Sequence, residues 1–193
     1  DKDDINKLRG FLETLLRFLW DMGLEVGHSV RTLKDCVREG KNDITVTTNL
    51  MESRLLHGDD ELFERMRHVT HAAKIWPSKK FFAAKRKEQK DRHHRFDDTA
   101  YNLEPNIKDG PGGLRDIQMI SWVTQRHFDT TSLHDLVDRE FLSEEEYHAL
   151  IRGRNFLWLV RAGLHYVAGR REDRLLFDHQ RTLAKHFGYS DEL

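Results

Sequence analysis

The sequence contains a single cysteine and few residues that interrupt helices. Cys36 is the only cysteine among 193 residues, so the chain has no internal disulfide and no cage of thiolate metal ligands. Only three prolines occur, and no apolar run reaches the ~18 residues of a membrane-spanning helix. The net charge of -1 gives no global field that would favour nucleic acid or an anionic membrane. These absences predict a cytoplasmic protein with no nucleic-acid or membrane partner.

The residues that are abundant favour a folded and mainly helical protein. Eleven Phe, four Trp and four Tyr argue against disorder, and 193 residues are enough to bury a core. Apolar residues recur with helical spacing along most of the chain. The predicted helices cover about 3–22, 32–40, 43–57, 60–74, 78–96, 113–128, 143–170 and 178–187. A capping box from Ser143 to Glu146 marks the start of the longest one.

Residues 24–31 alternate between apolar and polar side chains, as a half-buried β-strand does. Glu25 and Arg31 would project from the polar face of this strand, with Gly27 between them. Because a single strand is marginal on its own, we expect it to pair with strands that are not in this chain. The missing initiator Met also indicates a piece of a longer protein.

These elements define the expected fold class, which is mainly α: a helical bundle with a small β remnant. The best internal boundary is Trp76-Pro77, and Ser78 can cap the long helix that follows it. The boundary gives a first domain over 1–76, which holds the strand, and a helical domain over 77–193.

The polar face of the strand is the first candidate site. Glu25 lies beside Gly27 on that face, and a glycine lets another group approach the backbone. One or two carboxylates together with phosphate oxygens are the ligands that Mg²⁺ prefers. Glu25 is therefore a candidate metal ligand. The alternative, which the residues alone favour, is a solvated strand face with a weak ion pair.

The segment from Lys108 to Asp116 is the second candidate site. Three glycines, among them Gly112 and Gly113, precede a helix start there. Unpaired N–H groups, the helix dipole and the cations Lys108 and Arg115 would favour an anion. An ordinary tight turn, with glycine at positive φ, explains the same residues equally well.

A basic stretch at residues 79–95 is the third candidate. It contains eight Lys or Arg residues against two acidic ones. Such a stretch could steer phosphates or an acidic partner, but a charge run is more often a solvated helix face. His93 and His94 lie about 100° apart on a helix, so they do not form a two-histidine chelate.

Four stretches of the sequence resemble one bacterial family. They are Leu19–Leu33, Asp43–Leu56, Tyr101–Ile117 with its Gly-Pro-Gly-Gly-Leu-Arg-Asp string, and Arg174–Asp178. These strings are similar to those of the bifunctional PII uridylyltransferase/uridylyl-removing enzymes, and the resemblance covers essentially the whole chain. It implies an N-terminal nucleotidyltransferase domain of the DNA polymerase β type, then an HD-type hydrolase domain and paired ACT domains that bind glutamine.

The activity that the resemblance implies is transfer of UMP from UTP to a tyrosine of the PII protein, with removal of UMP by the HD domain. The family's Gly-Gly…Ser-Asp-x-Asp signature does not occur in this chain. The resemblance therefore implies a piece that starts after this motif, stops before the hydrolase domain and is inactive alone. The strand at 24–31 would be a remnant of the nucleotidyltransferase sheet, and glutamine would bind outside the chain.

The resemblance also assigns roles to the candidate residues. The superfamily supplies a third metal-associated carboxylate from a later strand, which points to Glu25, with Glu52 as the competing candidate. Mg²⁺ would bridge the phosphates of UTP, and Arg31 would contact a phosphate. A second rim around the nucleotide or a partner would consist of Lys108, Gly112, Gly113, Arg115 and Asp116.

Two alternatives stay open on the sequence. In one, the helical region is a non-catalytic module that docks PII or the hydrolase domain. In the other, the enzyme is an adenylyltransferase of glutamine synthetase, because those enzymes resemble the same segment. They carry an Asp where this chain has Gly27, and this departure counts against adenylyl transfer.

Overall fold

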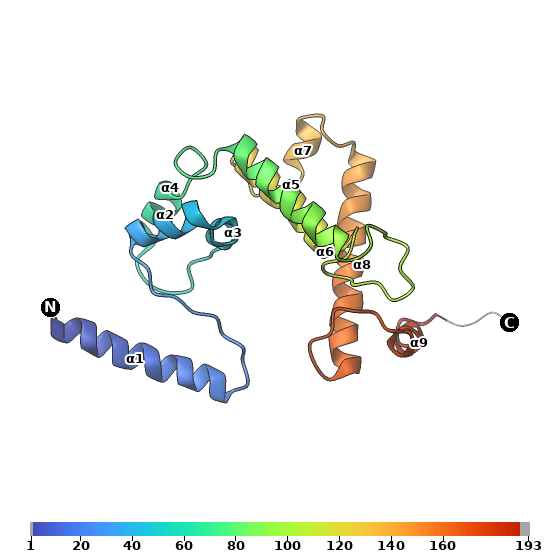
Figure 1. Cartoon of the computed structure of the whole chain (residues 1–193), viewed down its shortest axis with the longest axis horizontal. Coiled ribbons are helices and arrows are strands. Elements are labelled where there is room, and N and C mark those ends of the chain that lie inside the picture. The colour runs from blue at the N-terminus through green and yellow to red at the C-terminus, as the bar shows by residue number, and fades with distance from the viewer. Residues whose placement is uncertain (1, 190–193) are drawn as a thin grey trace. The chain divides into compact units, whose positions relative to one another are not determined.

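The computed structural model describes residues 2–189 of the chain, with side chains from residue 8 onward. The fold is mainly helical, as predicted (Figure 1). In chain order the helices are α1 (Lys2–Asp21), α2 (Leu33–Asn42), α3 (Ile44–Met51), α4 (Asp60–Val69), α5 (Ser78–His94), α6 (Leu114–Phe128), α7 (Asp135–Asp138), α8 (Glu144–Ala168) and α9 (Phe177–His186). None of the described helices is both long and apolar enough to cross a bilayer.

The β remnant that the sequence predicts is not confirmed. Residues 24–32 are irregular, and the Val26 N–H donates to the nearby Leu24 carbonyl (3.0 Å) instead of to a neighbouring strand. In the described part of the chain, the one pairing of the ladder type is an isolated antiparallel bridge between Asn106 and Arg174. A strand needs a neighbour to bond with, and the described residues provide none for this segment.

The chain divides into two compact units, Asp1–Asp35 and Cys36–Leu193. In the first unit, the apolar residues of α1 form one stripe, and the helix ends just before Gly23, whose φ is +78°. Phe11 and Phe18 of α1 are both more than half exposed.

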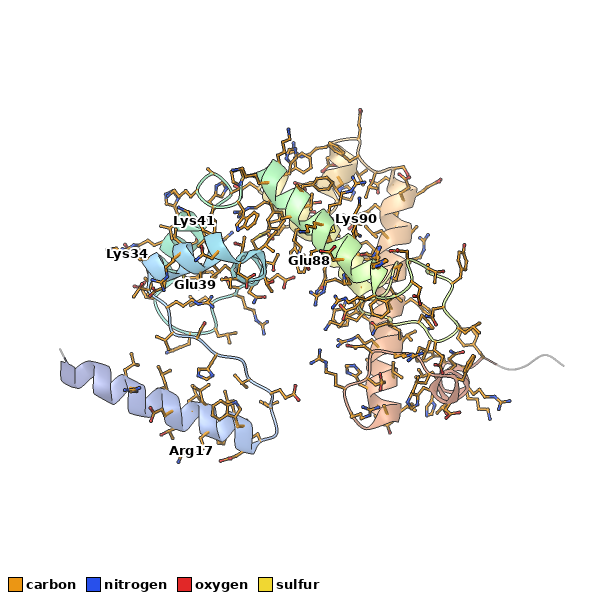
Figure 2. The ribbon with its side chains drawn as sticks, in the orientation of Figure 1. Arg17, Lys34, Glu39, Lys41, Glu88 and Lys90 are labelled. Atoms are coloured by element: carbon orange, nitrogen blue, oxygen red, sulfur yellow. The ribbon has the colours of Figure 1, made fainter. Side chains whose placement is uncertain are left out.

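Helix α2 shows how helical spacing in the sequence separates buried residues from exposed ones. Cys36 and Gly40 are four residues apart and buried, while Lys34 and Lys41 are exposed and extend into solvent (Figure 2). A Cβ on Gly40 would lie 3.0 Å from Cδ1 of Ile75, so glycine permits the close approach of these two segments.

Two apolar clusters form the core of the second unit. The cluster that joins α5 to α6 contains Phe81, Met119 and Trp122. The cluster that joins the segment before α6 to α8 and α9 contains Ile107, Val160, Leu164 and Leu183. Burying one large apolar side chain stabilises a fold by roughly 1.5–3 kcal/mol. These clusters hold α6 against α5, and α8 against α9.

Three predicted helix ends differ from the structure, and one of them is the end of the helix expected over 60–74, which stops at Val69. The helix expected over 43–57 stops at Met51, so Glu52 is the C-cap residue of α3 and the helix does not continue beyond it. The N-cap residue of α5 is Pro77, without a side-chain hydrogen bond, whereas Ser78 begins the helix. The Ser78 hydroxyl instead pairs with Nδ1 of His127 at 2.7 Å, which ties α5 to α6.

The start of α8 agrees with the sequence. The Ser143 side chain accepts the Glu146 N–H (3.2 Å), and the Glu146 carboxylate accepts the Ser143 N–H (2.8 Å). This is the predicted capping box, and it satisfies two N–H groups that the helix cannot bond internally.

The junction between α4 and α5 is fixed by a buried arginine of α6. Arg126 donates to three backbone carbonyls, those of Thr70 (3.2 Å), Ile75 and Trp76 (3.0 Å). Burial lowers the pKa of Arg126 to about 10. Trp76 has a φ of +47°, which is costly for a bulky residue, and its hydrogen bond to Arg126 helps to hold it there. The domain boundary predicted directly after Trp76 stays a prediction.

Candidate functional site

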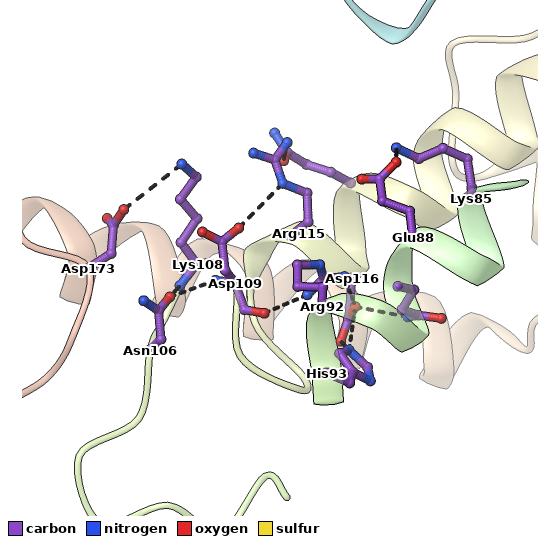
Figure 3. Close-up of polar contacts among 12 residues, drawn as sticks. Lys85, Glu88, Arg92, His93, Asn106, Lys108, Asp109, Arg115, Asp116 and Asp173 are labelled. Carbon is purple, nitrogen blue, oxygen red and sulfur yellow. Dashed lines mark hydrogen bonds and ion pairs between the residues drawn. The ribbon is translucent and has the colours of Figure 1, made fainter. Parts of the chain in front are cut away.

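A loop over residues 105–113 leads into α6 and forms the centre of the candidate site (Figure 3). Asn106 shapes its first turn, because its side-chain oxygen accepts the N–H groups of Lys108 (3.1 Å) and Asp109 (2.7 Å). Asn106 also forms the isolated bridge with Arg174. The loop is therefore tied to the segment between α8 and α9.

The glycines of this loop are required by close backbone contacts. A Cβ on Gly110 would lie 2.6 Å from the Asn106 carbonyl oxygen, and a Cβ on Gly113 would lie 2.7 Å from that of Ile107. Gly112 has a φ of +77°, which favours glycine. A tight turn, one of the two interpretations that the sequence left open, is therefore enough to explain Gly110, Gly112 and Gly113.

The N–H groups at the start of α6 have acceptors within the loop itself. The N–H groups of Leu114 and Arg115 donate to loop carbonyls at 3.0 and 2.8 Å, and the Gly112 N–H donates to the Asp116 carboxylate at 2.8 Å. The sequence argument for an anion assumed that such groups are unpaired, and that assumption is wrong for these three. The negative charge that the helix dipole favours comes from Asp116. An anion at this loop would have to be held by side chains.

Asp116 joins the loop to α5 through a partly buried cluster of polar side chains. Its carboxylate accepts hydrogen bonds from Arg92 (2.6 Å) and Gln89 (2.8 Å), and it lies 2.9 Å from Nε2 of His93 (Figure 3). A second nitrogen of Arg92 donates to a loop carbonyl at 2.6 Å. Burial raises the pKa of Asp116, but the hydrogen bonds from Arg92, Gln89 and Gly112 outweigh it and hold this pKa below its usual value.

Asp173 fixes the other end of the loop in a similar way. Its carboxylate accepts a hydrogen bond from Arg161 of α8 (2.6 Å) and lies 3.3 Å from Nε2 of His165. Burial raises the pKa of Asp173, but the bonds from Arg161 and His165 lower it more, so the pKa lies below its usual value. Nζ of Lys108 is 3.9 Å from the same carboxylate.

Lys108 of the loop and Arg115 in the first turn of α6 are two partly exposed cations. They extend to the same side of the loop, with the Asp109 carboxylate between them (Figure 3). Arg115 lies 3.6 Å from Asp109, and Lys108 lies 3.9 Å from Asp173. These distances exceed normal hydrogen-bond lengths. One Arg115 nitrogen donates to Oε1 of Gln118 at 3.0 Å, so the donors left for an anion are the other nitrogens of Arg115 and the Lys108 ammonium. The structure thus brings Lys108 and Arg115 together, as the rim prediction requires, while their role stays a prediction.

Glu52 is connected to this rim through Trp122 of α6. The Glu52 carboxylate accepts the indole N–H of Trp122 at 2.8 Å. Nζ of Lys85 lies 4.3 Å from the centre of the Trp122 ring, and the Arg115 guanidinium lies 5.5 Å from it. Lys85 is buried and bonds Glu88 at 2.7 Å. A carboxylate and two cations therefore surround one buried indole.

Glu25 and Arg31 belong to the other unit. Both are exposed in the irregular segment between α1 and α2. In the described part of the chain, no group of three His, Cys, Asp or Glu side chains is arranged to hold a metal ion. Glu25 can therefore offer Mg²⁺ a single carboxylate, and the other ligands would have to come from elsewhere. The metal-ligand role of Glu25 stays a prediction.

Sequence reasoning missed the residues that hold the loop. Gln89, Arg92 and His93 have the spacing i, i+3 and i+4, which places them on one face of α5, and this signal was available. The basic stretch of α5 was interpreted as a solvated face, but Lys85 and Arg92 are buried. Asp173 gave no signal, because its partners lie elsewhere in the chain.

The fold and the site together describe one class of protein. It is a mainly helical module whose glycine-rich loop is held by two partly buried carboxylates, Asp116 and Asp173, and carries cations at Lys108 and Arg115. The sequence model of one family, GlnD PII-uridylyltransferase, matches residues 80–193. The chain belongs to this family.

Curated proteins support the same assignment. The chain is 55% identical over 184 residues to the bifunctional uridylyltransferase/uridylyl-removing enzyme of Pseudomonas putida strain F1, covering 95% of the chain and 20% of that protein. The enzymes of Pseudomonas entomophila L48 and Pseudomonas aeruginosa PAO1 are each 53% identical, over 100% and 99% of the chain and 21% of each relative. The chain thus spans about a fifth of the length of these relatives. No solved structure matches it.

Proposed function

We propose that this chain is part of a bifunctional enzyme that transfers UMP from UTP to a tyrosine of a PII protein and also removes it. The observation that carries the proposal is the identity of 53–55% over 95–100% of the chain to enzymes named for both activities. The same names give no support to the alternative of adenylyl transfer to glutamine synthetase. Docking of PII or of a hydrolase domain by the helical region stays a prediction.

In this proposal Lys108 and Arg115 contact the phosphates of UTP or an acidic group of the partner protein. Transfer requires the tyrosine hydroxyl to attack the α-phosphate while pyrophosphate leaves, so negative charge develops between the reacting groups. Cations that are held in place before the reaction stabilise such charge. Gly112 and Gly113 let the loop backbone turn, and Asp116 holds it.

Glu25 is proposed as one carboxylate ligand of Mg²⁺, and Arg31 as a phosphate contact on the same segment. The fit is partial, because an exposed carboxylate suits a cation that is bound mainly by phosphate oxygens. When bound, Mg²⁺ would neutralise phosphate charge. Glu52 is the competing carboxylate, and its bond to Trp122 places it on the side of the rim cations. The segment 24–31 would become a strand when it pairs with the nucleotidyltransferase sheet.

The chain by itself is proposed to be inactive in UMP transfer, because it lacks the Gly-Gly…Ser-Asp-x-Asp signature. The test of the rim therefore uses the full-length enzyme with Lys108→Ala and Arg115→Ala combined. We expect kcat/KM for UTP in the transfer reaction to fall at least about tenfold, since a hydrogen bond to a charged group contributes roughly 1.5–3 kcal/mol. UMP removal is measured separately and should stay close to wild type.

The matched control removes two exposed cations of α9, Arg181→Ala with Lys185→Ala, and should leave both activities unchanged. Glu25→Gln and Glu52→Gln, assayed in the same way, decide between the two carboxylates. If the Lys108 and Arg115 variant transfers UMP within twofold of wild type, the rim does not contact the substrates and this part of the proposal is wrong.

A further inference from the structure

A cluster of basic side chains surrounds Asp173 in the segment between α8 and α9. Oδ1 of this carboxylate lies 2.6 Å from Nε of Arg161 and 3.3 Å from Nε2 of His165, both on α8. Nζ of Lys108 (Figure 3) and Nε of Arg171 each lie 3.9 Å from Oδ2. We call these five residues the Asp173 cluster. It joins the loop before α6 to α8 and to the segment that follows α8.

The Asp173 cluster carries more positive charge than its one carboxylate can neutralise. Lysine and arginine side chains are cationic at neutral pH. One carboxylate against three such cations leaves a net charge of +2 while the histidine is neutral. Nearby ion pairs each balance their own charge, and they are Arg170 with Glu172 (2.7 Å), Arg174 with Glu104 (3.2 Å) and Arg115 with Asp109 (3.6 Å). The excess positive charge therefore belongs to the cluster.

Two cations of the cluster have donors that the fold does not use. Arg161 holds the carboxylate through a short bond, and its side chain is mostly buried. At 3.9 Å, neither Nζ of Lys108 nor Nε of Arg171 is within hydrogen-bond distance of Asp173. The Arg171 side chain is 64% exposed. Lys108 and Arg171 are thus attracted to Asp173 while their N–H groups stay available to a ligand.

The spacing of these two cations suits one phosphate group. Each nitrogen lies 3.9 Å from the same oxygen of Asp173, so the two nitrogens are at most twice that distance apart. Charge-assisted hydrogen bonds to phosphate are about 2.8 Å long, so two of them with one phosphate group between them cover that separation. A phosphate also brings three acceptor oxygens and nearly two negative charges, whereas a carboxylate brings a single charge. The net charge of the cluster therefore matches a phosphate better than a carboxylate.

We propose that the Asp173 cluster binds a phosphate group between Lys108 and Arg171. Arg161 and His165 do not touch the phosphate in this proposal, because they hold Asp173, which positions the two cations. The ligand is a phosphate chain, either free pyrophosphate or the triphosphate of a nucleotide. The site shares Lys108 with the rim of the proposed function. It does not depend on UMP transfer, because it rests on the contacts and charges around Asp173.

The test measures binding of inorganic pyrophosphate to the 193-residue chain by isothermal titration calorimetry at fixed ionic strength. UTP and uridine are titrated in parallel, because they separate the phosphate chain from the nucleoside. We expect saturable binding of pyrophosphate and of UTP, and none of uridine. In proton–nitrogen NMR spectra the Nε–H signal of Arg171 should shift as pyrophosphate is added. The corresponding signal of Arg152, an exposed residue of α8 outside the cluster, should not shift.

Arg171→Ala is the deciding variant, and Arg170→Ala is its matched control. Both change an exposed arginine and remove one positive charge, so their long-range electrostatic effects are alike. Arg171→Ala should weaken pyrophosphate binding at least about fivefold, because a charge-assisted hydrogen bond is lost. Arg170→Ala should stay within about twofold of wild type, as expected for an exposed ion pair. Circular dichroism checks that each variant folds.

A double-mutant cycle tests whether the two cations share one phosphate. Lys108→Ala should also weaken pyrophosphate binding. If both side chains contact the same group, the combined variant should lose less affinity than the two single losses predict together. Independent effects of the two substitutions would show that Lys108 and Arg171 do not bind one phosphate.

Other results would also overturn the proposal. Equal effects of Arg171→Ala and Arg170→Ala would show that only general positive charge attracts the anion. Uridine that binds as tightly as UTP would remove phosphate as the recognised group. Pyrophosphate that does not saturate, or that leaves the Arg171 signal in place, would show that the cluster is not a phosphate site. These results are separate from the transfer kinetics of the Lys108 and Arg115 variant, which test the proposed function.

Discussion

Replacing Asp116 with Asn keeps the shape of the side chain but removes the negative charge beside Arg92. The two groups are 2.6 Å apart, and only 6% of the Arg92 side chain is exposed. Within the described residues, Nε of Arg92 has no hydrogen-bond partner, and besides Asp116 the guanidinium donates to one further acceptor, the Asp109 carbonyl, at 2.6 Å. Removing one member of a buried ion pair costs roughly 3–5 kcal/mol, because the other charge stays buried.

The expected cost of Asp116→Asn is about 3 kcal/mol, the lower end of that range, because the Asn oxygen can still accept one hydrogen bond. In a chain of this size a loss of that amount lowers Tm by roughly 6–12 °C. Urea unfolding followed by circular dichroism gives the free energy, and a thermal scan gives Tm. Asp91→Asn changes an exposed acid on α5 and should stay within about 0.5 kcal/mol of wild type.

A double-mutant cycle separates the pair from the rest of the cluster. Arg92→Met removes the buried cation, so the combined variant should be more stable than the sum of the two single losses predicts, by about 2 kcal/mol. Full additivity would show that Asp116 and Arg92 do not stabilise each other. A single loss below about 1 kcal/mol for Asp116→Asn would refute the buried-pair reasoning outright.

Two further predictions concern the stability of the fold at acidic pH and the effect of replacing glycine with alanine. Asp116 and Asp173 both have lowered pKa values, so their charges stabilise the fold above about pH 4, and this stability is lost as the pH falls through the folded-state pKa values. Urea unfolding at a series of acidic pH values should show this loss, and a smaller loss in Asp116→Asn. Gly113→Ala should destabilise by at least about 2 kcal/mol because its Cβ meets a carbonyl oxygen at 2.7 Å, whereas Gly153→Ala in α8 has open space and should stabilise by roughly 0.5–1 kcal/mol. Equal effects of the two substitutions in urea would contradict the close-contact argument.

Most of the helices could be predicted because apolar residues at helical spacing and capping residues are local signals in the sequence. The spacing of Cys36 and Gly40 in α2 and the capping box at Ser143 are examples. The strand predicted at 24–31 was not confirmed because a strand depends on residues outside its own segment. Alternation shows which residues suit a strand, but the bonds that make it a strand belong to a neighbour, and the described residues hold none.

The candidate site could be predicted only in outline. The glycine string and the flanking cations mark the loop, since both are local signals. The acceptors for the loop N–H groups and the partners of Asp116 depend on how α5 packs against α6, and Arg92 lies 24 residues away in the chain. Gln89, Arg92 and His93 share a face of α5, but the sequence alone does not show whether that face meets solvent or a carboxylate.

The contacts around the loop explain how its backbone can be fixed while its cations stay available. The short bonds, Arg92 to Asp116 and Arg161 to Asp173, are both 2.6 Å long and hold the two ends of the loop. The ion pairs of Lys108 and Arg115 are longer than 3.5 Å, and Arg115 uses one nitrogen to donate to Gln118 at 3.0 Å, so its other nitrogens and the Lys108 ammonium are left for an anion. A loop held in this way orders its cations before a ligand arrives, so less conformational entropy is lost on binding. If Lys108 and Arg115 bind an anion as proposed, loss of the Asp116 bond should weaken that binding, although Asp116 itself would not touch the anion.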